Sequence, residues 1–477
     1  MQRNSTTYYR APYILDGLDW LEDGYLAVDD GRVVDLVEKS ELPKGVRDDQ
    51  MVDLGRVALV PGLVNAHSHA FQRAIRGRTE YVDAERREDD FWTWRDQMYG
   101  AALSLDADQL EAVSRMAFLE MAAAGITTVG EFHYVHHRPD GRPYDDPNEL
   151  AHRVIRAARD VGVRISLLRV AYHRGGHDRP AEEKQRRFVE PDVETYLERV
   201  EALRERWAKK AGVTVGLAPH SIRAVPSGWL EAIGAYADEH GLPLHIHACE
   251  QRREIEESRA EYGASPIAVF EELGLLDDHL TIVHGTHVTE DELELLGRRK
   301  PTICACPTTE RNLGDGFLPA LELAERGVPV CLGSDSHTNI DLFEEMRLVE
   351  YHERLRRERR NVLAEDLDQP LLGPDARRWS TARALWPMGS LHGARALQLP
   401  VGCLEPGCAA DFVALDLDHL TMVGAEADSL LAYITLSMTP DAVRDVYVAG
   451  EPIIEERHHE RRDEIATEMR SVVSTLA

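Results

Sequence analysis

Apolar residues along the middle of this 477-residue chain fall into short strand-like runs that alternate with helix-like segments. Between the first two runs, apolar residues recur at the spacing of one helix face, at Leu110, Val113, Ala117 and Met121. Eight runs have the length and composition of strands: VALVPGLVNAHSHA, GITTVGEFHYVHH, VRISLLRVAYHRGG, VTVGLAPHSIRAV, PLHIHACEQ, LTIVHGTHVT, PTICACPTTERNLG and PVCLGSDSHTN. Strands that alternate with helices predict a parallel sheet, and eight such units predict an α/β fold of the closed (β/α)8, or TIM-like, barrel type.

The two ends of the chain have a different pattern, in which apolar and polar residues alternate and Gly or Asp marks turns. Examples are GYLAVDDGRVVDLVE, ADFVALDLDHLTMV and VRDVYVAGEPIIEE. This alternation is typical of antiparallel strands, and neither end is long enough to bury a core alone. We therefore expect residues 1–57 and 400–456 to form one small β-sandwich domain, residues 58–399 to form the barrel, and residues 457–477 to form a helical tail.

Composition narrows the classes of function. The chain is 43% hydrophobic, enough for a large core, and its formal net charge of -29 argues against nucleic acid or an anionic membrane as the main partner. No run approaches the length of a membrane-spanning helix, and the first residues lack the apolar core of a signal peptide. The six cysteines include no Cys-x-x-Cys pair, so we expect reduced thiols and no disulfide framework. These features predict a cytoplasmic enzyme or binding protein.

Polar residues collect where the predicted barrel strands end, which is where such barrels carry their catalytic groups. On the first strand, His67 and His69 share one face, because residues two apart in a strand point the same way. The other strand ends add Glu131, His133, Tyr134, His220, Arg223, His245, His247, Glu250, His284, His287, Asp335 and His337. Core packing does not explain histidines and carboxylates at so many strand ends, so the pattern indicates a metal site.

Three neutral imidazoles and one carboxylate suit a divalent ion such as zinc, with an open position for water. The predicted ligands are His67, His69, His247 and Asp335. A zinc-bound water ionises near neutral pH and so supplies a hydroxide nucleophile. Glu250 follows His247 by three residues and would move the proton of that water to a leaving group. His284 would orient the hydroxide or stabilise the tetrahedral adduct.

With these ligands the chain resembles the amidohydrolase superfamily, which has His-x-His on the first strand, His on the fifth and sixth, and Asp on the eighth. Binuclear members add a carboxylated lysine on the fourth strand, which has no lysine here, so the resemblance implies a mononuclear site of the deaminase type. Within the superfamily, the chain is most similar to the formimidoylglutamate deiminase family. The matching stretches are AHSHAFQRAIRGRTE, DDFWTWRDQMY, EFHYVHH, QRRF, APHSIRAV, HIHACEQRREIEE, CPTTERNLGDG and GSDSHTNIDLFEEMRLVEYHERLR.

This resemblance implies hydrolytic deimination of N-formimino-L-glutamate to N-formyl-L-glutamate and ammonia, a reaction of histidine degradation. It implies a homodimer with one Zn2+ per subunit on the four predicted ligands, another divalent transition metal being the alternative. It implies catalytic roles for Glu250, His284 and Asp335. The implied substrate-binding residues are Gln72, Arg95, Tyr134, His220 and Arg223. A small dicarboxylate amidine needs a cationic clamp, and arginine binds a carboxylate through two parallel hydrogen bonds.

Some positions depart from the family pattern or have no evident role. The departures are Arg169 and Ala171 in the third strand and Cys249 in the fifth. Arg73, Arg78 and Glu80 match the family without a role, and we interpret Glu310 and Asn312 as residues that shape the pocket. We expect the further histidines near the mouth to lie outside the ligand set: His133, His136, His137, His287 and His337. His458 and His459 are predicted to lie on an exposed helix face.

Two alternatives remain at this point. The first keeps the enzyme class and changes the substrate to another amidine or a nucleobase-like amine. The second is a catalytically inactive barrel that acts as a scaffold or binding protein. Such a chain usually loses metal ligands or the proton shuttle, whereas this chain keeps all of them, and a complete site favours a working enzyme.

Overall fold

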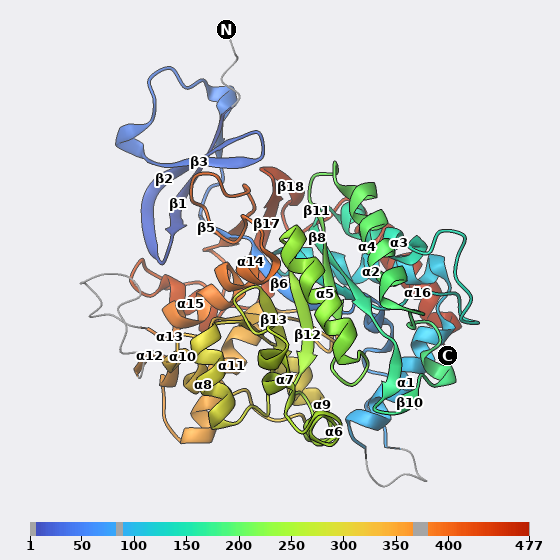
Figure 1. Ribbon diagram of the computed structural model, residues 1–477. Coiled ribbons are helices and arrows are strands. Elements are labelled where there is room, and N and C mark those ends of the chain that lie inside the picture. The colour runs from blue at the N-terminus through green and yellow to red at the C-terminus, as the bar shows by residue number, and fades with distance from the viewer. Residues whose placement is uncertain (1–5, 83–88, 366–379, 477) are drawn as a thin grey trace.

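The central sheet of the computed structural model is a parallel barrel, described here over residues 6–82, 89–365 and 380–476. Its strand order is β15-β14-β13-β12-β11-β8-β7-β6. The strands are β6 (Leu63–Ser68), β7 (Ile126–His133), β8 (Arg164–Ala171), β11 (Val213–Pro219), β12 (Leu244–Ala248), β13 (Leu280–His284), β14 (Thr302–Ala305) and β15 (Val330–Leu332). Helices cover the outside (Figure 1), and a bridge between Ser68 and Asp335 connects the last strand to the first. The predicted (β/α)8 barrel is confirmed.

The helices follow the strands in alternation. They are α1 (Phe91–Ser104), α2 (Ala107–Ala123), α3 (Glu149–Val161), α4 (Val193–Trp207), α5 (Ser227–His240), α6 (Arg252–Tyr262), α7 (Pro266–Glu272), α8 (Glu290–Arg299), α9 (Pro307–Leu313), α10 (Ala320–Glu325), α11 (Leu342–Arg357), α12 (Val362–Glu365), α13 (Thr381–Leu385), α14 (Leu391–Leu397), α15 (Leu430–Leu436) and α16 (Arg462–Thr475). The helix predicted after the first strand is α2. The Asp106 side chain caps its N-terminus by accepting a hydrogen bond from Gln109 N, and Gly125, at a φ of 81°, follows its end.

Strands from both ends of the chain form a second sheet, drawn in blue, orange and red in Figure 1. Its order is β18-β17-β16-β5-β1-β2-β3, and β4 pairs with β1. The bounds are β1 (Thr7–Asp16), β2 (Asp19–Asp29), β3 (Arg32–Glu38), β4 (Met51–Asp53), β5 (Val57–Pro61), β16 (Phe412–Asp416), β17 (Val443–Val448) and β18 (Glu451–Ile454). A separate small hairpin joins β9 (Arg174–Gly176) to β10 (Arg179–Pro180).

This terminal sheet closes on itself. Backbone hydrogen bonds of 2.9 Å join Val33 N to Cys408 O and Ala410 N to Gly31 O, so the edge strand β3 returns to the segment that leads into β16. The buried ring of Tyr9 lies 5.0 Å from that of Phe412 inside the closed sheet. Both termini therefore build one small β-unit with its own core, as the sequence predicted; its exact domain boundaries stay a prediction.

The first predicted strand is wrong in one respect, because it divides between the two sheets. β5 belongs to the terminal sheet and β6 to the barrel, and Gly62 separates them. A Cβ at Gly62 would lie 2.2 Å from Thr127 Oγ1, so the close approach of β7 to this segment requires glycine here. The apolar run continues through this point, which is why hydrophobicity alone did not show where one sheet ends.

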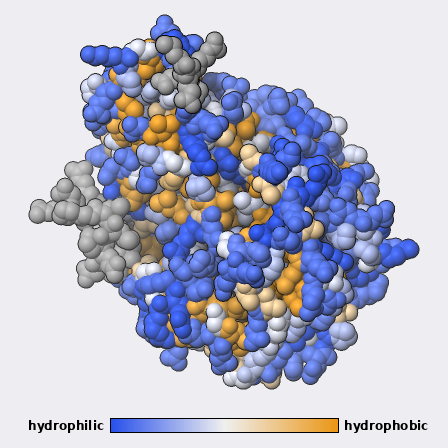
Figure 2. All heavy atoms as spheres, turned by 45° about the horizontal axis from the view of Figure 1, so that its top comes forward, coloured by the Kyte–Doolittle hydropathy of each residue, from blue (hydrophilic) through white to orange (hydrophobic). Residues whose placement is uncertain are grey.

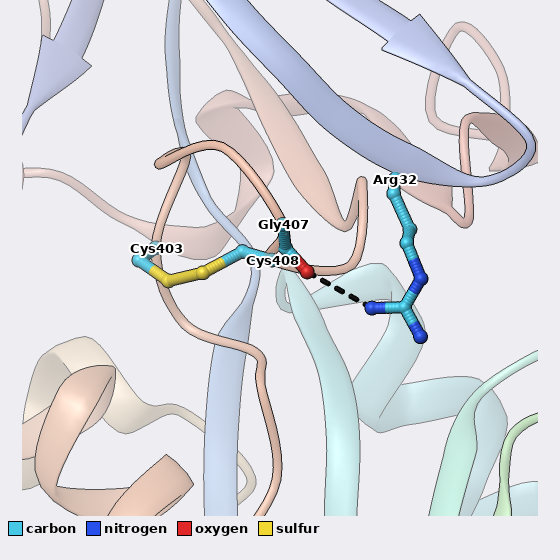
Figure 3. The surroundings of a disulfide bond; sticks show 4 residues. All are labelled: Arg32, Cys403, Gly407 and Cys408. Carbon is cyan, nitrogen blue, oxygen red and sulfur yellow. Dashed lines mark hydrogen bonds between the residues drawn. A yellow bond between two sulfur atoms is a disulfide. The ribbon is translucent and has the colours of Figure 1, made fainter.

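The expectation of no disulfide is also wrong. Cys403 and Cys408 form one, with their Cα atoms 6.3 Å apart (Figure 3), within the range that a disulfide can span. The bridged turn presents Gly407 O, which accepts a 2.9 Å hydrogen bond from Arg32 Nη1. The sequence did not predict this disulfide, because a separation of five residues does not show that the chain turns back between the two cysteines. The other four cysteines are buried free thiols, as predicted: Cys249, Cys304, Cys306 and Cys331.

The C-terminal tail is helical over α16, which lies beside α2 (Figure 1). Arg115 on α2 and Glu468 on α16 form an ion pair with a nitrogen–oxygen distance of 2.5 Å. His458 is exposed, as expected, but it precedes the helix. His459 also precedes the helix and is not exposed, because its buried Nε2 lies 3.2 Å from Val161 O. The periodicity of charged residues in this segment did not separate the turn from the helix.

The surface is largely polar. Figure 2 shows hydrophilic residues over most of the visible face, with apolar residues in separate patches. None of the helices in the part of the chain that the structure describes has the length and apolar character needed to cross a bilayer.

A buried ion pair joins the barrel to the terminal sheet, and we expect its loss to destabilise the protein. Arg164, the first residue of β8, lies 2.5 Å from the fully buried carboxylate of Asp411, which also accepts a hydrogen bond from Ala449 N. Arg164→Ala should lower the free energy of unfolding in urea by about 3 kcal/mol, because it leaves a buried charge without its partner. Arg56→Ala, which breaks an exposed pair with Asp418, should cost at most about 1 kcal/mol. Equal losses in both variants would contradict this role.

Candidate active site

Four side chains at the ends of β6, β12 and β15 converge on one point of the barrel. His67 Nε2 lies 3.2 Å from both His69 Nε2 and His247 Nε2. Asp335 Oδ1 lies 3.5 Å from His67 Nε2 and 3.4 Å from His69 Nε2. Four donors at about 2.0 Å around a tetrahedral ion stand about 3.3 Å from one another, so this cluster has the dimensions of a zinc site.

Hydrogen bonds at Nδ1 leave Nε2 of two of these imidazoles, His69 and His247, free to act as a ligand. His69 Nδ1 donates to Phe132 O and His247 Nδ1 donates to His220 O, each at 2.9 Å. Burial lowers the pKa of His67 to about 3 and also lowers that of His69 and His247, so the rings are neutral. The Nε2 atoms of three neutral imidazoles, with His67 Nε2 3.2 Å from each of the other two, can serve together as ligands of one cation. The donor set therefore fits a divalent metal.

Backbone geometry around the cluster is tight. Asp335 has a φ of 43° and His284 a φ of 76°, in the left-handed region that side chains other than glycine rarely adopt. Gly333, which follows β15, leaves no room for a side chain: a Cβ there would lie 2.7 Å from His67 Cβ. Burial disfavours the charged form of Asp335, yet its contacts with the neighbouring imidazoles hold the pKa of this carboxyl well below its usual range.

Glu250 and His284 face the donor cluster together. His284 Nε2 lies 3.7 Å from Glu250 Oε1 and 3.8 Å from Asp335 Oδ2. Burial raises the pKa of Glu250, against the effect of His284. Burial alone would lower the pKa of His284, but Glu250 and Glu310 raise it to about 10. A carboxyl group with a raised pKa beside a charged imidazole suits proton transfer at a reacting centre.

Two arginines in the same pocket have no acidic partner. Nε and Nη1 of Arg95 and Nε of Arg223 are buried without a hydrogen-bond partner, and neither side chain forms an ion pair among the described residues. Their Cζ atoms lie 4.5 Å and 5.5 Å from the Trp92 ring centroid. Burial and then the charge of Arg223 lower the pKa of Arg95. A half-buried and a buried guanidinium, neither in an ion pair among the described residues, form a site for a substrate with negative charges.

The remaining predicted substrate residues line this pocket between the donor cluster and the arginines. Gln72 Nε2 donates to Tyr134 OH at 2.9 Å, which leaves Gln72 Oε1 buried without a partner and free to accept from a ligand. The His220 ring lies 5.6 Å from the Tyr134 ring. All five side chains that the resemblance assigned to substrate therefore share one pocket with Glu250, His284 and Asp335.

Sequence reasoning missed several pocket residues, among them the titratable Tyr99 and Glu254. Burial raises the pKa of Glu254 to about 7. Its position in the first turn of α6, four residues after Glu250 in the chain, was an available signal. The departure at Arg169 does not reach the pocket, because this fully buried arginine pairs with Glu190 at 2.7 Å on the outer side of β8.

Arg73, Arg78 and Glu80 had no role assigned to them from the sequence. In the structure they fix the segment that follows β6. Arg73 pairs with Glu120 on α2, Arg78 donates to Val473 O and Leu476 O on the C-terminal segment, and Glu80 accepts from Asn312 Nδ2. These contacts are structural. The five further histidines lie outside the four-donor cluster; His337, for example, contacts the Ser68 and Ser334 hydroxyls.

The barrel, the donor cluster and the adjacent Glu250 and His284 together define a class of protein, the metal-dependent (β/α)8-barrel hydrolases. Within that class, the chain belongs to the amidohydrolase family, whose sequence model matches residues 58–453.

Known relatives agree with this membership. The chain is 39% identical over 420 residues to formimidoylglutamate deiminase of Pseudomonas aeruginosa, covering 88% of this chain and 89% of that protein. It is 27% identical to a 5-methylthioadenosine/S-adenosylhomocysteine deaminase of Halalkalibacterium halodurans, over 91% and 89% of the two chains. An amidohydrolase from Brucella melitensis matches its structure with a TM-score of 0.85 at 32% identity, over 98% and 99% of the chains. A zinc-bound adenosine deaminase from Xanthomonas campestris, with a TM-score of 0.80, 24% identity and 98% coverage of both chains, shares the fold.

Metal binding should depend on where along β12 a histidine lies. His247→Ala removes one of the four converging donors and should weaken divalent-metal binding by more than about 100-fold, measured by metal analysis after dialysis. His245 lies on the same strand with its Nε2 2.8 Å from Ala396 O, away from the cluster, so His245→Ala should keep the metal. Full metal content in the His247 variant would show that the cluster is not the metal site.

Proposed function

We propose that this protein hydrolyses N-formimino-L-glutamate to N-formyl-L-glutamate and ammonia. One observation carries the proposal: Arg95 and Arg223, which form no ion pair among the described residues, share a pocket with a four-donor cluster and with Glu250 and His284. A substrate with two carboxylates and a formamidine satisfies both halves of this pocket. The 39% identity with a formimidoylglutamate deiminase supports the same reaction.

In this proposal one Zn2+, or another divalent transition metal, is held by His67, His69, His247 and Asp335. When bound, such an ion acidifies water and supplies a nucleophile at neutral pH. The nitrogens and oxygen of the cluster, already spaced at 3.2 to 3.5 Å, need little rearrangement to hold it.

Binding and orientation of the substrate come from the chain itself. Arg95 and Arg223 hold the carboxylates, stacked against the Trp92 ring. Gln72 Oε1 accepts a hydrogen bond from a formamidine N–H, since its amide nitrogen is engaged by Tyr134. These contacts hold the formamidine carbon near the donor cluster, and binding energy from the distant carboxylates fixes its orientation.

Proton transfer is assigned to Glu250 and His284. Glu250 takes a proton from the attacking water and delivers it to the departing nitrogen, so that ammonia leaves and the carbon keeps the new oxygen as a formyl group. His284 Nε2 donates to the reacting oxygen as negative charge develops on it. One water is consumed and one C–N bond is broken.

A nucleobase-like amine is the competing substrate class, because relatives at 27% identity are nucleoside deaminases. Such substrates carry no pair of carboxylates and would leave both arginines in the closed pocket without an ion-pair partner. An uncompensated charge removed from water makes the free energy of binding less favourable by several kcal/mol. The arginines therefore favour the dicarboxylate. The homodimeric state, the cytoplasmic location and the place in histidine degradation stay predictions.

The test is turnover across a substrate panel. Purified protein should release ammonia and N-formyl-L-glutamate from N-formimino-L-glutamate, and should act far more slowly on guanine, adenosine and S-adenosylhomocysteine. Glu250→Gln, which retains the four metal donors, should keep its metal and lose most of its kcat, which assigns the activity to this site. Turnover of a nucleoside with none of N-formimino-L-glutamate would refute the proposal.

The arginines should act through binding. Arg95→Ala and Arg223→Ala should each raise KM for N-formimino-L-glutamate by about 10- to 100-fold, because a charged hydrogen bond contributes about 1.5 to 3 kcal/mol. Arg253→Ala is the matched control: this exposed guanidinium lies 4.5 Å from the same Trp92 ring but pairs with Glu257 and does not line the pocket. A KM unchanged in both pocket variants would show that the carboxylates bind elsewhere.

A further inference from the structure

Glu310 lies directly behind His284, on the side away from the reacting centre. Its Oε1 is 3.3 Å from His284 Nδ1 and accepts a 2.9 Å hydrogen bond from Cys306 N. Both side chains are 1% exposed, so water does not compete for this contact. Glu310 enters the site from the first turns of α9, whereas His284 ends β13.

This contact determines which nitrogen of His284 reaches the reacting centre. A carboxylate accepts only, so Nδ1 must carry a proton and must point toward Glu310. The opposite nitrogen, Nε2, then points toward Glu250 and Asp335, at 3.7 and 3.8 Å. Among the described residues no other hydrogen-bond partner of Nδ1 restrains this ring.

A purely structural role, as a cap of α9, does not account for a buried carboxylate at Glu310. Its bond to Cys306 N resembles an N-terminal cap of α9, but Glu345 already accepts from Thr308 N at the same helix end. Glu310 Oε2 is buried without a partner among the described residues. Burying one carboxylate oxygen without a partner is costly, and a glutamine at this position would offer Cys306 N an acceptor oxygen without burying a charge.

We propose that Glu310 is a positioning residue that orients His284, so that Nε2 of this histidine donates to the oxygen of the tetrahedral adduct. The proposal rests on the proposed function, since it assigns Glu310 a part in the same reaction. Glu310 acts through His284 and touches neither substrate nor metal ligands. The charge of the carboxylate matters as well as its shape, because it compensates the positive charge on the imidazole during the step.

Glu310→Gln keeps the size of the side chain and an acceptor oxygen but removes the charge. It should lower kcat at least about tenfold, with KM and metal content close to wild type. Affinity for an analogue with tetrahedral phosphorus in place of the formamidine carbon should fall by a similar factor, while affinity for N-formyl-L-glutamate should hold. Glu310→Asp, which retains the charge, should recover part of kcat.

Glu345→Gln is the matched control, because it removes a buried carboxylate from the same helix end without touching His284. It should change the melting temperature and leave kcat near wild type. Equal kcat losses in the Glu310→Gln and Glu345→Gln variants, or loss of metal in the former, would overturn the proposal in favour of a structural role. Wild-type protein is the reference in every assay: if it does not act on N-formimino-L-glutamate, the proposed function fails, whereas an active wild type with an unaffected Glu310→Gln variant refutes the positioning role alone.

Discussion

Closure of the barrel between β6 and β15 is the constraint on which the rest of the structure depends. His69 N donates to Asp335 O and Asp335 N donates to His67 O, both at 3.1 Å, so the seam runs through three of the four converging donors. The histidines and the aspartate come from opposite ends of the barrel sequence and can meet only when the last strand reaches the first. Barrel assembly and formation of the donor cluster are therefore one event.

The charge distribution of the pocket opposes that of the whole molecule. A net charge of -29 repels anions at long range, whereas Arg95 and Arg223 attract them inside a pocket where the dielectric is low. Holding two cations in a pocket without ion-pair partners among the described residues costs stability, and the proposed dicarboxylate substrate would offset that cost. The same region is also rich in carboxylates: Glu250 and Glu310 lie 3.7 and 3.3 Å from the two ring nitrogens of His284, and Glu254 lines the pocket.

Strand periodicity predicted the fold well because barrel strands are short, apolar and separated by helices. The two-residue spacing of His67 and His69 placed both rings on one face, and the structure has them there. Periodicity failed where a segment changes the element it packs against while its pattern of apolar and polar residues continues unchanged. The run through Gly62 stays apolar while it leaves one sheet for the other, and His459 lies in a turn whose charges match the helix that follows.

The sequence by itself determined the order of the elements, the donor types at the strand ends and, through local motifs, the family, because each depends on residues close together along the chain. Only the tertiary structure decided that Arg95 and Arg223 are unpaired, that Glu310 contacts His284 and that Cys403 meets Cys408. A pattern along one segment carries no information about what packs against it. Hydrogen-bond partners, burial and charge compensation are properties of neighbours in space, and those neighbours come from distant parts of the chain.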